Sequence, residues 1–315
     1  MCLYKINPKH SLILKKNNQL IVTKDNKFKI YKVAEEEVYQ TKAFMQKEMF
    51  EKQNTKIFKK LINKNVLIKC TNVQPNRNIH SYLEGYTNSK INMEDLKNKN
   101  VFVIGLGGIG CEVITHLVGN GVKHLVILDF DTVDETNLNR QYLYTYNDFS
   151  KDKVDLINKK IKEKDPNVKV TKYNKFITCS KDVLDIIIKE NIDMVICAAD
   201  TPYLDIRMSI LDACVSTKTP CIFGGLNIIT GQYGPTLIDI KKMKNYYKEL
   251  QKVKELVLCS NINKASFGPT NTIISAYMAI DIIMTLLGKK KYINSLNKIK
   301  TINFITRQDY EEKKF

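Results

Sequence analysis

An apolar run followed by closely spaced glycines limits the possible folds of this chain more than any other feature. Residues 101–104 have the composition of a buried strand, and a helix is expected over 109–120. Between and within them stand the glycines of a G-x-G-x-x-G pattern: Gly105, Gly107 and Gly110. Glycine permits a tight turn and lets the backbone approach a phosphate at the positive end of the helix. A nucleotide site is therefore predicted, although the same turn without any ligand is the alternative.

Strands and helices alternate from Lys99 onward, which predicts a parallel sheet. The expected strands are 101–104, 125–128, 168–173, 194–198 and 221–223, and the helices between them are 109–120, 153–164, 180–191 (capped by Ser180) and 204–217. The order then changes to an extended run at 233–240, a charged helix at 242–254, an apolar helix at 271–287 ended by Gly288, and a strand at 299–305. The expected fold class is α/β, a Rossmann-like, mostly parallel sheet with helices on both faces.

A smaller segment precedes this sheet. Short extended runs at 11–14, 19–23 and 28–31, separated by turn-like residues, predict a three-strand meander, followed by helices near 33–50 and 55–62 and an extended piece at 66–69. Residues 72–98 are polar and contain Pro75, as in a linker or extended arm. The predicted organisation is a small N-terminal α+β domain (1–71), the arm (72–98) and a large domain (99–315).

The bulk composition excludes several classes of protein. Residues 1–8 hold no signal-peptide-like apolar run, and the apolar stretch near 272–287 is interrupted by Asp281, so a membrane span is not expected. None of the eight cysteines forms a C-x-x-C pair, and Cys197 and Cys221 lie in strand-like runs as small buried thiols. These features predict a cytoplasmic protein. The net charge of +17 comes from scattered lysines, which favours a solvated basic surface over one that binds a polyanion such as nucleic acid, with an acidic partner as the remaining expectation.

A second motif separates ATP from NAD. Asp129 follows Gly110 by 19 residues, where a carboxylate suits a ribose hydroxyl pair. Just beyond it come Arg140 and Lys153, two cations for which a dehydrogenase has no use. Attack of a carboxylate on the α-phosphate of ATP does need them, because charge builds on phosphate oxygens as pyrophosphate leaves. Asp200 then follows the strand at 194–198, where an acid can hold magnesium.

The segment D-F-D-T-V-D-E-T-N-L-N-R-Q at 129–141, after G-L-G-G-I-G at 105–110, resembles the ThiF/MoeB family of adenylating enzymes, over about 99–288. The resemblance implies binding of ATP and Mg²⁺. It places Gly107 and Gly108 against the phosphates and Asp129 on the ribose, with Asp131 in the nucleotide site and Asp200 on magnesium. The residues that it assigns to the phosphates are Asn137, Arg140, Gln141 and Lys153.

The resemblance also implies a homodimer in which an arginine from an N-terminal arm reaches the partner's triphosphate. Arg77 is the candidate, although His80 stands where the family has a second arginine. Members that activate sulfur carriers have two C-x-x-C pairs for zinc. Here 240–255 is rich in lysine and tyrosine and no such pair occurs, so no zinc is expected. Cys259 is the one thiol in the region of a thioester or persulfide cysteine, where an inert thiol is the simpler interpretation.

Residues 1–71 and the run at 265–271 are similar to the peptide-modifying branch of the family, typified by the microcin C adenylating enzymes. That likeness implies a short, ribosomally made precursor peptide as partner, held by the small domain and adenylated on a carboxylate before cyclisation, dehydration or nucleotide attachment. The small domain as a mere buttress is the alternative for residues 1–70. Other hypotheses are activation of a ubiquitin-like sulfur carrier, a nicotinamide-dependent oxidoreductase and a catalytically silent peptide-binding scaffold.

Overall fold

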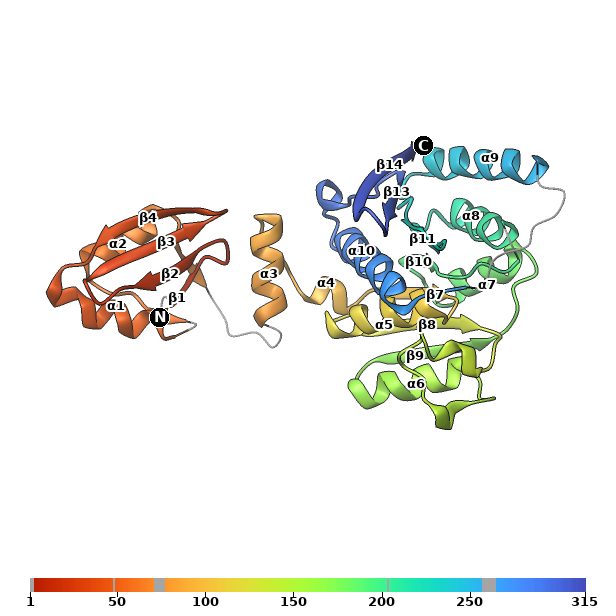
Figure 1. The fold of residues 1–315 in the computed structure, drawn as a ribbon, viewed down its shortest axis with the longest axis horizontal. Coiled ribbons are helices and arrows are strands. Elements are labelled where there is room, and N and C mark those ends of the chain that lie inside the picture. Colours follow the sequence, from red (N-terminus) through yellow and green to blue (C-terminus); the bar gives the residue numbers. More distant parts are fainter. Residues whose placement is uncertain (1–2, 48, 71–76, 203, 257–264) are drawn as a thin grey trace. The chain divides into compact units, whose positions relative to one another are not determined.

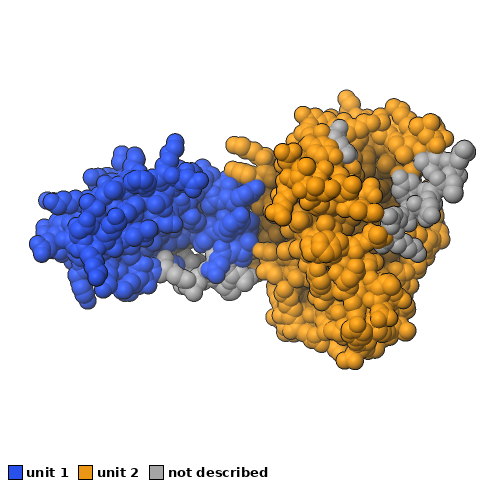
Figure 2. All heavy atoms as spheres, viewed as in Figure 1, with its two compact units in different colours: residues 1–91 blue, residues 92–315 orange. Residues whose placement is uncertain are grey.

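The computed structural model describes residues 3–47, 49–70, 77–202, 204–256 and 265–315. The chain forms two compact units, residues 1–91 (unit 1) and residues 92–315 (unit 2), which Figure 2 shows in different colours. The boundary lies between Ile91 and Asn92, inside the stretch predicted as an arm. No helix within the described ranges is both long and apolar enough to cross a membrane.

Unit 2 is built on an eight-stranded sheet with the order β14-β13-β12-β11-β10-β7-β8-β9 (Figure 1). Its strands are β7 (Asn100–Ile104), β8 (His124–Asp129), β9 (Lys169–Asn174), β10 (Met194–Cys197), β11 (Cys221–Leu226), β12 (Thr230–Tyr233), β13 (Lys298–Asn303) and β14 (Gln308–Lys314). The strands from β11 to β9 are parallel, and β12 to β14 are antiparallel additions. The predicted α/β class with a mostly parallel sheet is confirmed.

The strand order reverses at β7, and this reversal positions the site. The chain passes from β7 to β8 and β9 on one side, then crosses to β10 and β11 on the other. Ligands of such sheets bind outside the carboxyl ends of the strands at this switch point. The glycine turn after β7, Asp129 at the end of β8 and Asp200 after β10 therefore share one edge of the sheet.

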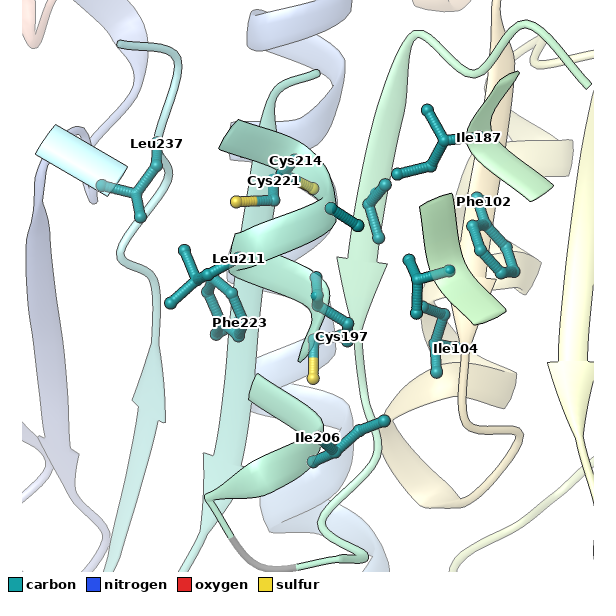
Figure 3. Packing of buried hydrophobic residues seen from close by; sticks show 14 of the residues in the cluster. Phe102, Ile104, Ile187, Cys197, Ile206, Leu211, Cys214, Cys221, Phe223 and Leu237 are labelled. Atoms are coloured by element: carbon teal, nitrogen blue, oxygen red, sulfur yellow. The ribbon is translucent and has the colours of Figure 1, made fainter. Parts of the chain in front are cut away.

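Helices cover both faces of the sheet, as expected. On one face α5 (Gly108–Gly119) and α10 (Gly268–Leu286) pack against each other, and α6 (Lys153–Lys164) lies against β8 and β9. On the other face α7 (Ser180–Lys189), α8 (Asp205–Thr217) and α9 (Ile240–Leu256) enclose a core of alternate strand residues. Figure 3 shows this core, in which Phe102, Cys197 and Phe223 from three strands meet α8. Burial raises the pKa of Cys197 to about 11, so the prediction of a structural thiol is confirmed there.

Three local predictions differ from the structure. The extended run at 233–240 is not one strand: β12 (Thr230–Tyr233) ends before Gly234, whose φ is +84°, and Pro235, and only isolated bridges at Thr236 and Leu237 follow. Helix α7 is capped by Cys179 and not by Ser180, and the Asp182 carboxylate accepts hydrogen bonds from the amides of Thr178 and Cys179. Strand β14 was not predicted, since its sequence is almost entirely polar and it is held by pairing with β13.

Unit 1 contains the predicted meander: β2 (Ser11–Leu14), β3 (Gln19–Lys24) and β4 (Lys27–Lys32). A second sheet, which the sequence did not predict as such, has the order β5-β1-β6, with β1 (Leu3–Ile6), β5 (Phe50–Glu51) and β6 (Leu67–Cys70). The helices that accompany the two sheets in unit 1 include η1 (Glu35–Glu37), α1 (Val38–Met45) and α2 (Lys56–Asn63). Tyr4, Phe44, Phe50 and Phe58 pack edge-on or tilted in the core, at centroid distances of 5.0–5.9 Å. Apolar area and aromatic geometry together stabilise this small unit.

The described part of the predicted arm contains two helices, which the scattered polar residues did not indicate. Helix α3 (Arg77–Thr87) belongs to unit 1, where Glu84 pairs with Lys5 at 3.0 Å. The short α4 (Glu94–Lys97) belongs to unit 2 and places Leu96 in its core.

Candidate nucleotide-binding site

The glycines after β7 are required by close approach and by backbone conformation. Gly105 has a φ of +93°, and a Cβ there would lie 2.8 Å from the carbonyl of Ala198. A Cβ at Gly110 would lie 1.9 Å from the carbonyl oxygen of Gly105. Gly107 is different, because a Cβ built there would have Gln141 Nε2 as its nearest neighbour, at 4.0 Å. Gly105 and Gly110 thus form the turn, whereas Gly107 keeps open space at the start of α5.

Asp129 fixes the glycine turn as well as facing the site. Its Oδ2 accepts a hydrogen bond from the Leu106 amide at 2.6 Å, and its Oδ1 accepts one from the Asp131 amide at 2.9 Å. The residue is 7% exposed, and burial raises the pKa of its carboxyl, which Lys153 and the two amides oppose. Each carboxylate oxygen has a second lone pair, so the group can still accept from a ribose hydroxyl.

Lys153 is a buried cation at the first position of α6. It is 5% exposed, and its Nζ lies 2.9 Å from Oδ2 of Asp131, which is half exposed. The Lys153 amide also donates to the Asp131 carbonyl. Asp131 therefore holds the lysine in the site, a positioning role that the motif alone did not reveal.

The segment between β8 and α6 contains η2 (Glu135–Asn137), which forms a reciprocal cap. Asn137 Oδ1 accepts from the Asp134 amide, and Asp134 Oδ1 accepts from the Thr136 amide. Asn137 thus shapes the loop. Arg140 Nη1 donates to the Thr136 carbonyl at 2.7 Å and to Asn139 Oδ1 at 2.9 Å.

Gln141 is buried beside the glycine turn. It is 2% exposed, and its Oε1 is a buried acceptor without a hydrogen-bond donor among the described residues. A buried acceptor of this kind is costly unless a ligand or water donates to it. Gln141 is therefore suited to a donor on a bound nucleotide.

The start of α10 closes the site on another side, a contribution that sequence reasoning missed. Asn139 Nδ2 donates to the Ser266 carbonyl at 2.8 Å. A Cβ at Gly108 would lie 2.3 Å from Asn271 Oδ1, and one at Gly268 would lie 1.9 Å from Tyr142 Oη. The glycine turn, the loop that carries Arg140 and the start of α10 thus meet at distances that only glycine allows.

Asp200 lies three positions beyond Cys197, the last buried residue of β10, at the same sheet edge. It is exposed, and the Thr201 hydroxyl donates to it at 3.2 Å. Throughout the described ranges, no three acidic, histidine or cysteine side chains are grouped closely enough to hold a metal by themselves. A single carboxylate still suits Mg²⁺, which takes one or two carboxylates together with phosphate oxygens.

Two predicted residues receive no side-chain geometry. The backbone of Arg77 begins α3, but its side chain lies outside what the structure describes. Cys259 lies outside the described residues altogether. His80 is placed within unit 1, with Nε2 2.9 Å from the Ile91 carbonyl and 3.6 Å from Glu84.

Tyr144 and Cys111 stabilise the glycine turn through hydrogen bonds to its backbone. The Tyr144 hydroxyl and the Cys111 thiol both donate to the Leu106 carbonyl, at 3.1 and 3.2 Å. Both residues are buried, and burial raises the pKa of Cys111 to about 12, which leaves it a neutral donor. Leu106 is thus held at its amide by Asp129 and at its carbonyl by these two side chains.

Tyr144→Phe is expected to reduce the free energy of unfolding by about 1 kcal/mol, because a buried carbonyl loses its better donor. Urea denaturation measures this change, with Tyr146→Phe as the control, since Tyr146 is 70% exposed. Equal stability of the two variants would show that the Leu106 carbonyl does not depend on Tyr144.

A sequence model of the ThiF family matches residues 77–314. The chain belongs to the ThiF family. Among relatives, it is 34% identical over 192 residues to the adenylyltransferase and sulfurtransferase MOCS3 of Culex quinquefasciatus, which covers 60% of this chain and 42% of that protein. It is 30% identical over 201 residues to the sulfur carrier protein adenylyltransferase of Thermus thermophilus, covering 62% and 72% of the two chains. The chain thus spans about two fifths of the MOCS3 relatives that it matches.

The ThiF fold of this chain is similar to that of E. coli MccB, solved with AMPCPP and MccA. The TM-score is 0.72 at 20% identity, covering all of this chain and 97% of MccB. PaaA gives a TM-score of 0.66 at 20% identity, covering 82% and 91% of the two chains. The predicted family is confirmed, and the likeness to MccB extends over unit 1, which lies largely outside the matched ThiF region.

Proposed function

We propose that this chain is an ATP-dependent adenylyltransferase that activates a carboxylate of a short, ribosomally made precursor peptide. The observation that carries the proposal is the arrangement at the switch point of the sheet. There the glycine turn, Asp129 and the Lys153–Asp131 pair adjoin the loop of Arg140. Family relatives of this chain are named as adenylyltransferases. Membership of the ThiF family also favours ATP over a nicotinamide cofactor.

The residues of the site fit a nucleoside triphosphate. Open space at Gly107 admits phosphate oxygens to the backbone amides at the start of α5. Asp129 can accept from the ribose, and Gln141 Oε1, which has no donor in the described part of the chain, can accept from a donor on the nucleotide. ATP supplies an electrophilic α-phosphorus and a pyrophosphate leaving group. Lys153 and Arg140 stabilise the negative charge that builds there, as preorganised cations do for phosphoryl chemistry.

The remaining parts of the site are proposed by likeness. Asp200 would hold Mg²⁺ with the phosphates, and Arg77 of a second copy would reach the triphosphate. A homodimer is supported by the exposed face of α10. Its outward residues Ile273, Tyr277 and Ile280 are 40–43% exposed and carry no charge, although the chain as a whole has a net charge of +17. An uncharged surface lets two copies of a strongly basic chain approach with less electrostatic repulsion than a lysine-rich one would.

A peptide substrate is supported by the similarity of the whole fold, unit 1 included, to MccB, a protein solved together with MccA. Unit 1 would bind the peptide's leader, and unit 2 would adenylate a carboxylate of the peptide. Modification by cyclisation, dehydration or nucleotide attachment then follows in the biosynthesis of a peptide antibiotic. We place the enzyme in the cytoplasm, where ATP and nascent peptides are available.

Activation of a ubiquitin-like sulfur carrier is the second candidate. The Thermus relative, 30% identical, is named as a sulfur carrier protein adenylyltransferase, which favours this substrate. Unit 1 favours the peptide, because most of it lies outside the ThiF match at 77–314 and the likeness to MccB, solved with MccA, extends over it. A catalytically silent scaffold is the third candidate, and the exchange assay below separates it from the other two.

ATP–pyrophosphate exchange tests the proposal. The purified chain is assayed alone, with short peptides encoded beside its gene and with a sulfur-carrier protein. Exchange is expected only with a peptide, and Asp200→Ala and Arg140→Ala are each expected to lower it about a hundred-fold or more. Asp212→Ala, an exposed acid on α8, is the matched control and keeps full activity. Exchange driven by the sulfur carrier alone would identify the second candidate, and ATP binding without any exchange would identify the scaffold.

A further inference from the structure

The charge of this protein is concentrated in its smaller unit. Residues 1–91 contain 18 lysines and arginines against seven aspartates and glutamates, which is +11 of the chain's net +17. The scattered lysines of the sequence therefore conceal a strong asymmetry between the two units. An anionic partner is attracted to unit 1 far more than to unit 2.

One face of the β2-β3-β4 meander is turned away from the core of unit 1. Leu12, Leu20 and Val22 point into that core or pack against it. The alternate residues point the other way, because successive side chains of a strand lie on opposite faces. Ile13 pairs with Ile21 and Ile21 with Ile30, so three isoleucines form a row across the outer face. Ile13 is 52% exposed and Ile30 50% exposed.

The next row on the same face borders a basic hollow. Ser11 pairs with Thr23 and Thr23 with Phe28, and Phe28 is 67% exposed. These three residues line a hollow of about 450 Å³ together with the β3–β4 turn and the chain before β2. The other lining residues are Pro8, Lys9, Lys24, Asp25, Asn26 and Lys27. Three lysines against one aspartate make the hollow cationic.

The direction of the pKa shift of His10 agrees with a cationic hollow. Burial lowers the pKa of its ring, and Lys24 and Lys9 lower it further against the opposing effect of Asp25. A positive potential therefore prevails beside the hollow. Neutral His10 leaves the three lysines as the groups that can meet an anion.

We infer that the outer face of the meander and its basic hollow bind an acidic peptide segment in which an apolar residue stands two positions before an acidic one. The two rows are two residues apart along the strands, which is about 7 Å. An extended peptide spaces side chains i and i+2 by the same distance, so an apolar residue at i covers the isoleucine row and an acid at i+2 enters the hollow. The inference rests on the proposed role of unit 1 in peptide recognition and specifies the chemistry of the segment that it takes.

A nucleic acid fits this surface less well. Arg77 is the one arginine among the 18 cations of residues 1–91, whereas phosphate recognition favours the arginine fork. The central row is aliphatic, and Phe28 is the one ring among the residues of the two rows, whereas a single strand of nucleic acid stacks successive bases on several aromatic side chains. Carboxylates and aliphatic side chains match the surface better.

Fluorescence anisotropy on the full chain tests the inference. The probes are a labelled peptide of repeating Ile-Ser-Asp-Ser, the same peptide with Asn for Asp, and an oligothymidylate of equal length. The acidic peptide is expected to bind more tightly than the other two. Lys24→Ala with Lys27→Ala is expected to weaken its binding about five-fold, the effect of losing two exposed ion pairs. Ile13→Ser with Ile30→Ser is expected to weaken binding of both peptides.

The matched control is Lys56→Ala with Lys59→Ala on α2, which removes the same charge from exposed positions of unit 1. An equal loss in the two lysine pairs would overturn the inference, because binding would then follow net charge and not the hollow. Equal binding of the Asp and Asn peptides, or tighter binding of the oligothymidylate, would overturn it as well. ATP binding is measured in the same samples, so a failed peptide site is distinguished from a failed nucleotide site.

Discussion

Lys153→Met is expected to slow ATP–pyrophosphate exchange by about a hundred- to a thousand-fold, because a preorganised cation is removed from the place where phosphate charge develops. The fold should survive the change. Methionine has a similar length and suits a position that is 5% exposed. The partner Asp131 has a side chain that is 48% exposed, so its carboxylate remains solvated when the lysine is lost.

Lys159→Met on the same helix is the control, since the side chain of Lys159 is 70% exposed. It is expected to retain full exchange. Thermal unfolding of both variants shows that the folded state is intact. Exchange by Lys153→Met within ten-fold of the parent protein would contradict the assigned role of the buried lysine.

Gly107→Ala is expected to reduce ATP affinity at least ten-fold while the melting temperature changes by less than about 2 °C. The structure gives a reason for the unchanged melting temperature and for the lower ATP affinity. Apart from its chain neighbours, the nearest described atom to a methyl group at Gly107 is Gln141 Nε2 at 4.0 Å, and the φ of −80° at Gly107 suits any L-residue. The methyl group would instead occupy space that the phosphates need at the start of α5.

Gly110→Ala gives the opposite result and serves as the comparison. Its Cβ would lie 1.9 Å from the Gly105 carbonyl oxygen, so the turn itself must distort. We expect a large loss of stability together with the loss of ATP binding. Calorimetry and equilibrium ATP binding on both variants separate the two roles of glycine. Normal ATP affinity in Gly107→Ala would show that no phosphate approaches the backbone there.

Much of unit 2 could be predicted because its signals are local. The strand over 101–104, the glycine spacing and the helix over 153–164 each depend on a few neighbouring residues, and the structure has β7, α5 and α6 at those places. Buried parallel strands leave continuous apolar runs in a sequence. Strand β14 was missed for the opposite reason, since an exposed edge strand of polar residues depends on its pairing partner and leaves no such run.

In the candidate site, too, some residues could be predicted from local sequence signals and others could not. Gly105, Asp129, Arg140 and Lys153 could be named from motif spacing, because the chemistry of phosphate binding restricts the residue types. The support from Asn271, Tyr144 and Cys111 could not be named. Asn271 lies against Gly108 although it is far from it along the chain, and the buried Tyr144 and Cys111 donate to the Leu106 carbonyl.

The sequence by itself determined the α/β class, the family and the candidate residues for a nucleotide site, since each of these depends on local spacing and periodicity. Only the tertiary structure decided that Asp131 holds Lys153, that Asp129 anchors the Leu106 amide and that α10 closes the site. It also placed Ile13, Ile21 and Ile30 in one row beside the lysines of unit 1. Such groupings arise from strand register and helix packing, which bring together residues that no local pattern connects.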